Sequence, residues 1–309
     1  MSKLELVGFS SSDKLRLPGL LYTPKKESKQ AAIWLHGMGD NGIFYNPDRI
    51  NALGQCLTDK NIALLAFNNR GAHGSKILRI DDETLPEEDR SYQGGTNYEL
   101  IADCVQDING AVTFLHNHGY SKIYLIGHST GANKICAYHA LTSNNSISKY
   151  VLAGPGDDSG IYYSELGKNK FWRALNKAKS LIATNKPLHI MPKSSGMFPF
   201  SAQAAADILD PDGGYNTFPF YEAVKERIGH KPLFQEYRTF DRPTLVVFGD
   251  QDEYAYTAGG AGAALSILKQ YLPENIQAAS AFRLLQQADH SFHGYEGVFA
   301  EMVATWLAS

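Results

Sequence analysis

The chain is poor in cysteine and has no long apolar run. Its 309 residues hold three cysteines, Cys56, Cys104 and Cys136, which form neither a Cys-x-x-Cys pair nor a His/Cys cluster at zinc spacing. This spacing excludes a disulfide framework, and we expect free, buried thiols in a reducing compartment. No stretch of about 18 consecutive apolar residues occurs, so no membrane-spanning helix is predicted.

The chain also lacks a strong charge of one sign. It holds 29 Lys and Arg against 32 Asp and Glu, a net charge of −3, and no run of basic residues dense enough for a polyanion. We therefore expect no nucleic acid partner. Residues 1–7 carry an early glutamate and no apolar segment of the kind found in signal peptides. Together with the free thiols, this predicts a cytoplasmic protein.

Short apolar runs typical of buried strands alternate with helical patterns along most of the chain. Such alternation predicts an α/β fold with a mostly parallel sheet flanked by helices on both faces. Two polar-interrupted runs at the start predict an antiparallel pair, and residues 98–117 predict the longest amphipathic helix. The expected strands are 4–9, 15–22, 31–35, 62–67, 122–126, 149–154, 243–249 and 281–285, and the other core helices are 49–59, 263–271 and 297–307.

Residues 155–240 interrupt this alternation. They contain polar loops, seven prolines and an amphipathic helix near residues 171–184. We interpret them as a helical lid inserted between two late strands of the sheet. The predicted organisation is therefore an α/β core of residues 1–154 and 241–309, with a lid of residues 155–240. The aromatic residues at 198–200 and 218–221 either line a substrate pocket or form the core of the lid itself.

A pentapeptide with two glycines around a serine follows the expected strand 122–126. It reads Gly127-His128-Ser129-Thr130-Gly131 and precedes a helical stretch. A serine at such a tight strand-to-helix turn has its hydroxyl exposed, because small neighbours relieve the crowding of the turn. The pattern predicts that Ser129 is the nucleophile of a serine hydrolase, whereas His128 beside it is expected to pack or to form hydrogen bonds.

A serine hydroxyl needs a base and an orienting carboxylate to act as a nucleophile at neutral pH. Acids follow the expected strand 243–249, where Asp250, Asp252 and Glu253 compete for the role of the carboxylate. Histidines follow the last strand, where His290 and His293 compete for the role of the base. Carboxyl ends of strands are where open α/β sheets bind their ligands.

The oxyanion of an acyl-transfer reaction needs backbone N–H donors. His36-Gly37-Met38-Gly39 follows the expected strand 31–35, and its glycines allow the Met38 N–H to face the turn that carries Ser129. The Thr130 N–H is the predicted second donor. His36 is expected to be structural.

Taken together, these motifs resemble the α/β-hydrolase superfamily of serine hydrolases over nearly the whole chain. In that family the acid stands three residues after the strand-terminal glycine, which selects Asp252, and an Ala-Asp-His-Ser-Phe-like segment selects His290. The resemblance extends loosely to feruloyl- and cinnamoyl-type esterases, monoacylglycerol-lipase-like enzymes and siderophore-ester hydrolases. The segments that carry it are 36–39, 69–75, 127–131, 249–252 and 288–292, with Asn68 where an aspartate is common and Gly74 one position late.

The resemblance implies a serine carboxylesterase with a Ser129, Asp252 and His290 triad and an acyl-enzyme intermediate. The implied partner is a small-molecule ester, and neither a metal nor an organic cofactor is expected. The same triad serves amide, thioester and carbon–carbon bond cleavage, so these remain alternatives, as does a non-catalytic binding protein of this fold. The identity of the ester and the oligomeric state stay open.

Overall fold

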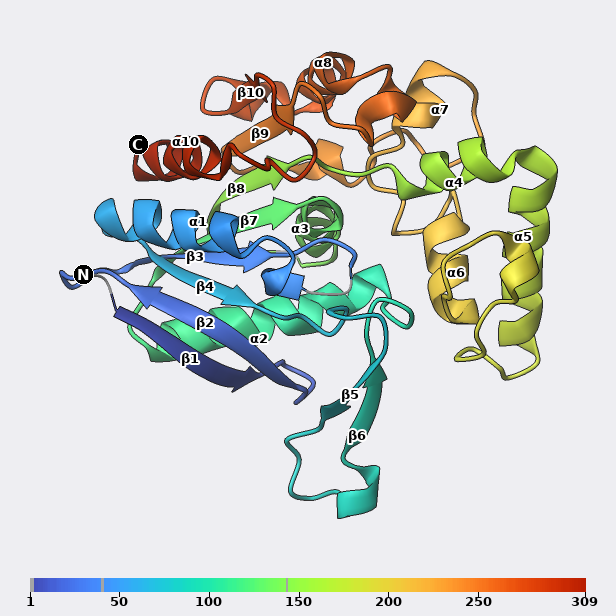
Figure 1. Cartoon of the computed structure of the whole chain (residues 1–309), viewed down its shortest axis with the longest axis horizontal. Helices are drawn as coiled ribbons and strands as arrows, with labels where there is room; N and C mark the ends of the chain where they lie inside the picture. The colour runs from blue at the N-terminus through green and yellow to red at the C-terminus, as the bar shows by residue number, and fades with distance from the viewer. Residues whose placement is uncertain (1–2, 40–41, 143) are drawn as a thin grey trace.

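The computed structural model describes residues 3–39, 42–142 and 144–309. Within these ranges eight strands form one sheet in the order β1-β2-β4-β3-β7-β8-β9-β10 (Figure 1). The first two pair antiparallel and β2 is antiparallel to β4, whereas every pair from β4 to β10 is parallel. The strands are β1 Lys3–Ser10, β2 Arg16–Thr23, β3 Gln30–Leu35, β4 Ala63–Phe67, β7 Lys122–His128, β8 Ile147–Ala153, β9 Thr244–Gly249 and β10 Ala281–Leu285.

Helices cover both faces of the sheet, because the central strands are apolar on both sides. Strands β3, β4, β7 and β9 are buried over nearly their whole length. Helices α1 and α10 contribute to the core on one face, and α2, α3 and α8 to the core on the other. This arrangement confirms the predicted fold class. The helices are α1 Pro47–Asp59, α2 Cys104–Asn117, α3 Thr130–Leu141, α8 Ala261–Tyr271, the short α9 Glu274–Gln277 and α10 Glu296–Ala308.

Helix α2 begins later than the apolar spacing predicts. Leu100 is extended, and residues Ile101–Asp103 form a 3-10 turn before the α-helix starts at Cys104. The Ile101 N–H donates to the Asp207 carboxylate at 2.7 Å, so a side chain from a distant segment replaces a helical hydrogen bond here. Periodicity alone cannot reveal such a tertiary cap.

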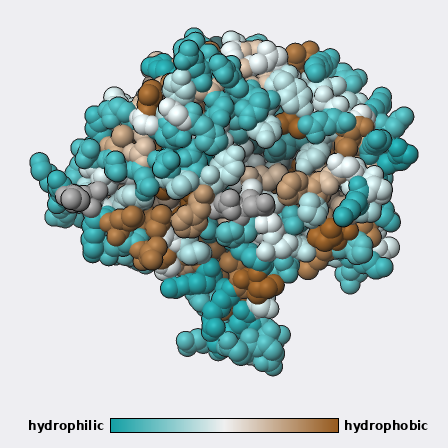
Figure 2. All heavy atoms as spheres, in the orientation of Figure 1, coloured by the Kyte–Doolittle hydropathy of each residue, from teal (hydrophilic) through white to brown (hydrophobic). Residues whose placement is uncertain are grey.

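A hairpin of strands β5 (Lys76–Arg79) and β6 (Ser91–Gly94) projects from the core as an arm that the sequence did not predict (Figure 1). Its tip is hydrophilic (Figure 2). The residues between its strands are rich in Asp and Glu, so the arm lacks the apolar alternation that marks a strand.

The segment between β8 and β9, which we call the insertion (residues 155–240), folds into four α-helices in the described residues. Its longest helix, α5, has 16 residues, so the expectation that 98–117 would be the longest helix is wrong. The insertion has a small core around Tyr163, Phe171 and Leu175, and Phe200, Phe218 and Phe220 are buried as well. The helices are α4 Asp158–Leu166, α5 Lys168–Ala183, α6 Ala202–Leu209 and α7 Phe220–Val224.

None of the helices that the structure describes has both the length and the apolarity needed to cross a bilayer.

Candidate active site

Ser129 occupies the sharp turn between β7 and α3. Its backbone has φ 56° and ψ −130°, a conformation that costs a residue with a Cβ about 1–3 kcal/mol. Hydrogen bonds hold the turn, since Ser129 N donates to the Ala153 carbonyl and Ala132 N donates to the Ser129 carbonyl, each at 2.8 Å. The surrounding sheet therefore maintains a strained serine at the carboxyl end of a central strand.

Close backbone approaches explain the glycines around the serine. A Cβ on Gly127 would collide with the carbonyl of Gly131, and a Cβ on Gly131 would collide with that of Leu35. A Cβ on Gly37 would lie 2.7 Å from the Cβ of Ser129. The loop after β3 thus touches the turn that carries Ser129, which places backbone groups of both segments beside one hydroxyl.

His290 pairs with Asp252 and with neither of the competing acids. Its Nδ1 lies 2.9 Å from Asp252 Oδ2 and 3.0 Å from Oδ1, and both side chains are buried. Glu253 instead accepts the backbone N–H of His290 at 3.1 Å. Asp250 Oδ1 is buried without a hydrogen-bond partner among the described residues. The competing histidine, His293, is exposed and bonded to Asp289 at 2.8 Å.

Most of the predicted site residues line one cavity of about 270 Å³. Ser129, His290, Met38 and Thr130 all line it, and Asp252 lies behind His290. Thr130 is the first residue of α3, so its N–H has no acceptor within the helix. Among the described residues the structure records no hydrogen bond between Ser129 Oγ and His290. Catalytic hydrogen bonds of free enzymes are commonly long and shorten when substrate binds.

His36 stabilises the loop after β3 as a neutral ring. The Asn69 N–H donates to His36 Nε2 at 3.2 Å, so the proton resides on Nδ1, which donates to the Gly37 carbonyl at 2.7 Å. Burial and the nearby Lys134 hold the pKa of His36 well below its usual value. A neutral, fully engaged ring fits the structural role expected for His36.

Side chains on other elements fix the backbone of the His290 loop. His128 Nε2 lies 2.8 Å from the His290 carbonyl, which can only accept, so this nitrogen carries the proton. Arg49 Nη1 donates to the Ser291 carbonyl at 3.0 Å, and its guanidinium lies over the Trp34 ring at 4.9 Å. Burial lowers the pKa of His128, and the charge of Arg49 lowers it further. No sequence pattern indicates that Arg49 contacts this loop.

Asp158 is a wall residue of the cavity that sequence reasoning missed. It is the first residue of α4, and its Oδ2 accepts a hydrogen bond from the Tyr215 hydroxyl at 2.8 Å. Burial raises the pKa of Asp158, while Tyr215, His290 and the Thr130 hydroxyl oppose that shift. The sequence does place two acids, Asp157 and Asp158, a few residues after the end of β8, and this strand ends at the same sheet edge as Ser129.

Aromatic side chains surround the entrance of the cavity. Tyr45, Phe198 and Tyr254 line it and are each about half exposed, and Ile161 adds an aliphatic wall. Phe198 belongs to the insertion, so one of the aromatic residues considered at the sequence level does line the pocket. The cavity therefore combines an apolar entrance with the carboxylate of Asp158 on its wall.

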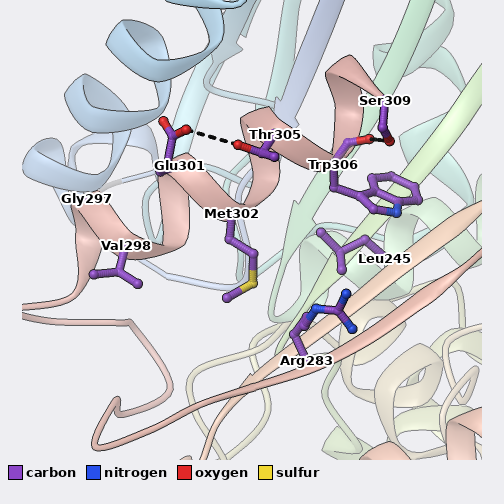
Figure 3. A pocket seen from close by; sticks show the side chains of 9 residues that line it. All are labelled: Leu245, Arg283, Gly297, Val298, Glu301, Met302, Thr305, Trp306 and Ser309. Atoms are coloured by element: carbon purple, nitrogen blue, oxygen red, sulfur yellow. Dashed lines mark hydrogen bonds between the residues drawn. The ribbon is translucent and has the colours of Figure 1, made fainter.

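A larger groove of about 700 Å³ lies beside α10, away from these residues (Figure 3). It is lined by apolar side chains such as Met302 and Trp306, and Glu301 there bonds to Thr305 at 3.0 Å. It contains neither a histidine nor a strained serine. In the described ranges, no cluster of three or more His, Cys, Asp or Glu side chains could hold a metal ion.

Comparison with known proteins identifies related sequences and folds. A family model described as "Serine aminopeptidase, S33" matches residues 26–299. A comparison with curated proteins returned no match.

Solved structures resemble the chain over nearly its whole length. Est1E from Butyrivibrio proteoclasticus, with ferulic acid bound, is 14% identical with a TM-score of 0.61, covering 97% of each chain. The esterase domain of a Rhodothermus marinus protein is 16% identical with a TM-score of 0.58, covering 99% of this chain and 98% of that one. A monoacylglycerol lipase from Paleococcus ferrophilus is 15% identical with a TM-score of 0.58, again covering 99% and 98%. At these identities the likeness establishes the fold.

Proposed function

Because the chain belongs to the hydrolase family described as serine aminopeptidase S33, we propose that it cleaves carboxylic esters through an acyl-enzyme intermediate. The observation that carries this proposal is the buried Asp252–His290 pair, whose histidine lines the same cavity as the strained Ser129. The names of two of the similar solved structures, an esterase domain and a monoacylglycerol lipase, favour esters over other electrophiles.

In this mechanism Ser129 Oγ attacks the ester carbonyl carbon while His290 Nε2 takes its proton. The C–O bond to the alcohol then breaks, and the alcohol leaves with the proton that His290 returns. Water repeats the sequence on the acyl-enzyme, with His290 as its base, and releases the acid. Asp252 fixes the ring by accepting the Nδ1–H and stabilises the imidazolium that forms.

The proposed oxyanion hole consists of the Met38 and Thr130 N–H groups. Both residues line the cavity, and the contact between Gly37 and Ser129 brings the two segments together. Backbone donors that are already in place cost no reorganisation when negative charge develops on the carbonyl oxygen. We further propose that the insertion acts as a lid whose side chains select the substrate, since Asp158 and Phe198 both come from it.

Labelling with a fluorophosphonate tests the proposed nucleophile. The probe mimics the tetrahedral intermediate and reacts with activated serines, so we expect one label per chain, on Ser129. Intact-protein and peptide mass spectrometry would locate it. Prior heating to unfold the protein is the control, and it should abolish labelling. A label on another serine, or none, would refute the proposed role of Ser129.

Asp158 is expected to favour substrates that carry a hydrogen-bond donor. The Asp158→Asn change keeps the shape and an acceptor for Tyr215 but removes the charge. A hydrogen bond to a charged group contributes about 1.5–3 kcal/mol, so kcat/KM should fall roughly tenfold to a hundredfold for donor-bearing esters. Matched p-nitrophenyl esters ending in methyl, hydroxyl or ammonium provide the measurement.

The methyl-terminated ester should respond to Asp158→Asn by less than about threefold, and Glu165→Gln, an exposed change on the same helix, should leave all three esters unaffected. An equal loss for the three esters would show that Asp158 supports the fold of the pocket and does not select substrate. An α-amino p-nitroanilide in the same assay tests the amide alternative.

A further inference from the structure

The charge of the chain is unevenly distributed. Residues 166–206 contain seven Lys and Arg and no Asp or Glu, whereas the rest of the chain holds 22 Lys and Arg against 32 Asp and Glu. A segment of the insertion thus has a formal charge of +7 on a protein that is otherwise at −10. Sequence reasoning looked for consecutive basic residues and missed this segment, because its basic residues are separated by apolar ones.

Helix α5 displays part of this charge as a stripe. Lys170, Arg173 and Lys177 are three and four positions apart, so they lie on one side of the helix, and all three are exposed. The side that carries Phe171 and Leu175 is buried in the insertion. Of the seven basic residues, Lys179 is the one with an ion-pair partner in the described part of the chain, Asp210 at 2.8 Å. Within the residues that the structure describes, Lys170, Arg173 and Lys177 therefore form no ion pair with an acidic side chain.

Exposed apolar side chains accompany the basic ones. Leu188 is 49% exposed, Ile190 36% and Phe198 51%. The loop that carries them starts at the end of α5, where Lys186 N donates to the Leu181 carbonyl, and its 3-10 turn Lys193–Ser195 packs against α5. Figure 1 shows α5 and this loop at the outer edge of the insertion, and Figure 2 shows hydrophilic and apolar surface adjoining on that side.

We propose that this surface, formed by Lys170, Arg173, Lys177, Lys186 and Lys193 together with Leu188, Ile190 and Phe198, binds an anionic lipid surface. Clustered basic residues are attracted to anionic headgroups, each contributing roughly a fivefold gain in binding. Aliphatic and aromatic side chains gain by entering the boundary between headgroups and acyl chains. An RNA or a polyanionic sugar would account for the charge but would leave the exposed Leu188 and Ile190 without a partner.

Phe198 connects this surface to the candidate active site, because it also lines the cavity beside Ser129. Docking through the surface would bring the cavity entrance close to the lipid. The inference concerns binding alone, so it stands whether or not the proposed ester cleavage is correct.

Vesicle sedimentation of the full chain tests the proposal. Binding to phosphatidylcholine vesicles containing about 30% phosphatidylserine should exceed binding to pure phosphatidylcholine and should weaken as salt rises. The triple variant Lys170→Gln, Arg173→Gln, Lys177→Gln should bind roughly 100-fold more weakly. The matched control is Lys25→Gln, Lys26→Gln, Lys29→Gln, which removes the same charge from an exposed turn of the core and should bind like the unaltered chain.

The double variant Leu188→Ser, Ile190→Ser separates lipid from other polyanions. It should weaken vesicle binding at least about fivefold while leaving any binding to heparin unchanged, because burial of two aliphatic side chains contributes only at a lipid surface. Circular dichroism and the unfolding midpoint establish that each variant folds. Equal vesicle binding by the two triple variants, or tighter binding to heparin or RNA than to vesicles at physiological salt, would overturn the proposal.

Discussion

Ser129→Ala is expected to lower kcat for p-nitrophenyl butyrate by roughly 10⁴- to 10⁶-fold. The change removes the only atom that forms the proposed covalent intermediate, and loss of a nucleophile leaves only the contribution of binding and of the oxyanion hole. KM should change little, because the substrate loses no contact other than the hydroxyl. The unfolding midpoint should shift by no more than about 2 °C, since no described hydrogen bond depends on Ser129 Oγ.

Ser291 provides the matched control. Its side chain lines the same cavity and its hydroxyl contacts the Tyr45 hydroxyl at 3.3 Å, yet it lies outside the turn between β7 and α3. Ser291→Ala should therefore retain activity within about tenfold of the unaltered protein. If Ser129→Ala kept measurable turnover above background while Ser291→Ala lost it, the nucleophile would have to be reassigned.

Asp252→Asn is the second change with a large expected effect, a fall in kcat of roughly 10⁴-fold. An amide in place of the carboxylate favours the wrong tautomer of the histidine, because its NH₂ group donates where Nδ1–H must donate. The imidazolium formed during attack also loses its counter-charge. The shape of the side chain is retained, so the loss should appear in kcat while the fold, followed by circular dichroism, is unchanged.

The two competing acids supply controls for this change. Asp250→Asn leaves the His290 ring untouched and should keep nearly full activity. Glu253→Gln weakens one backbone hydrogen bond of the His290 loop and should cost about tenfold. A larger loss in either control than in Asp252→Asn would mean that the loop rearranges in the working enzyme and that another carboxylate orients the histidine.

The elements with strong local signals were predictable from the sequence. Continuous apolar runs indicated the buried strands such as β4. The predicted strand 281–285 also has the same bounds as the edge strand β10. The position of Ser129 between strand and helix followed from two glycines that its tight turn requires. The choice of Asp252 over its neighbours depended on a family pattern. In the structure the carboxylate of Asp252 lies within hydrogen-bond distance of His290 Nδ1. The catalytic roles of these residues stay predictions until the variants are measured.

Features that depend on contacts between distant segments could not be predicted from the sequence. Asp158 meets Tyr215 across 57 positions of the chain, and Arg49 reaches the Ser291 carbonyl across 242 positions. No periodicity marks such pairs, because each partner alone is an ordinary polar residue. The late start of α2 was missed for the same reason, since the distant Asp207 carboxylate caps that helix. The β5–β6 arm was missed because it lacks the apolar alternation of a strand.

The sequence by itself therefore determined the fold class, the turn that holds Ser129 and a short set of possible partners for it. Local steric rules and the burial of apolar side chains act over a few neighbouring residues, so they produce patterns that can be recognised in the sequence. Tertiary structure decided which acid faces His290, which carboxylate lines the cavity and where the basic residues of the insertion gather. Electrostatics and hydrogen bonds depend on distances in space, and the fold alone fixes those distances.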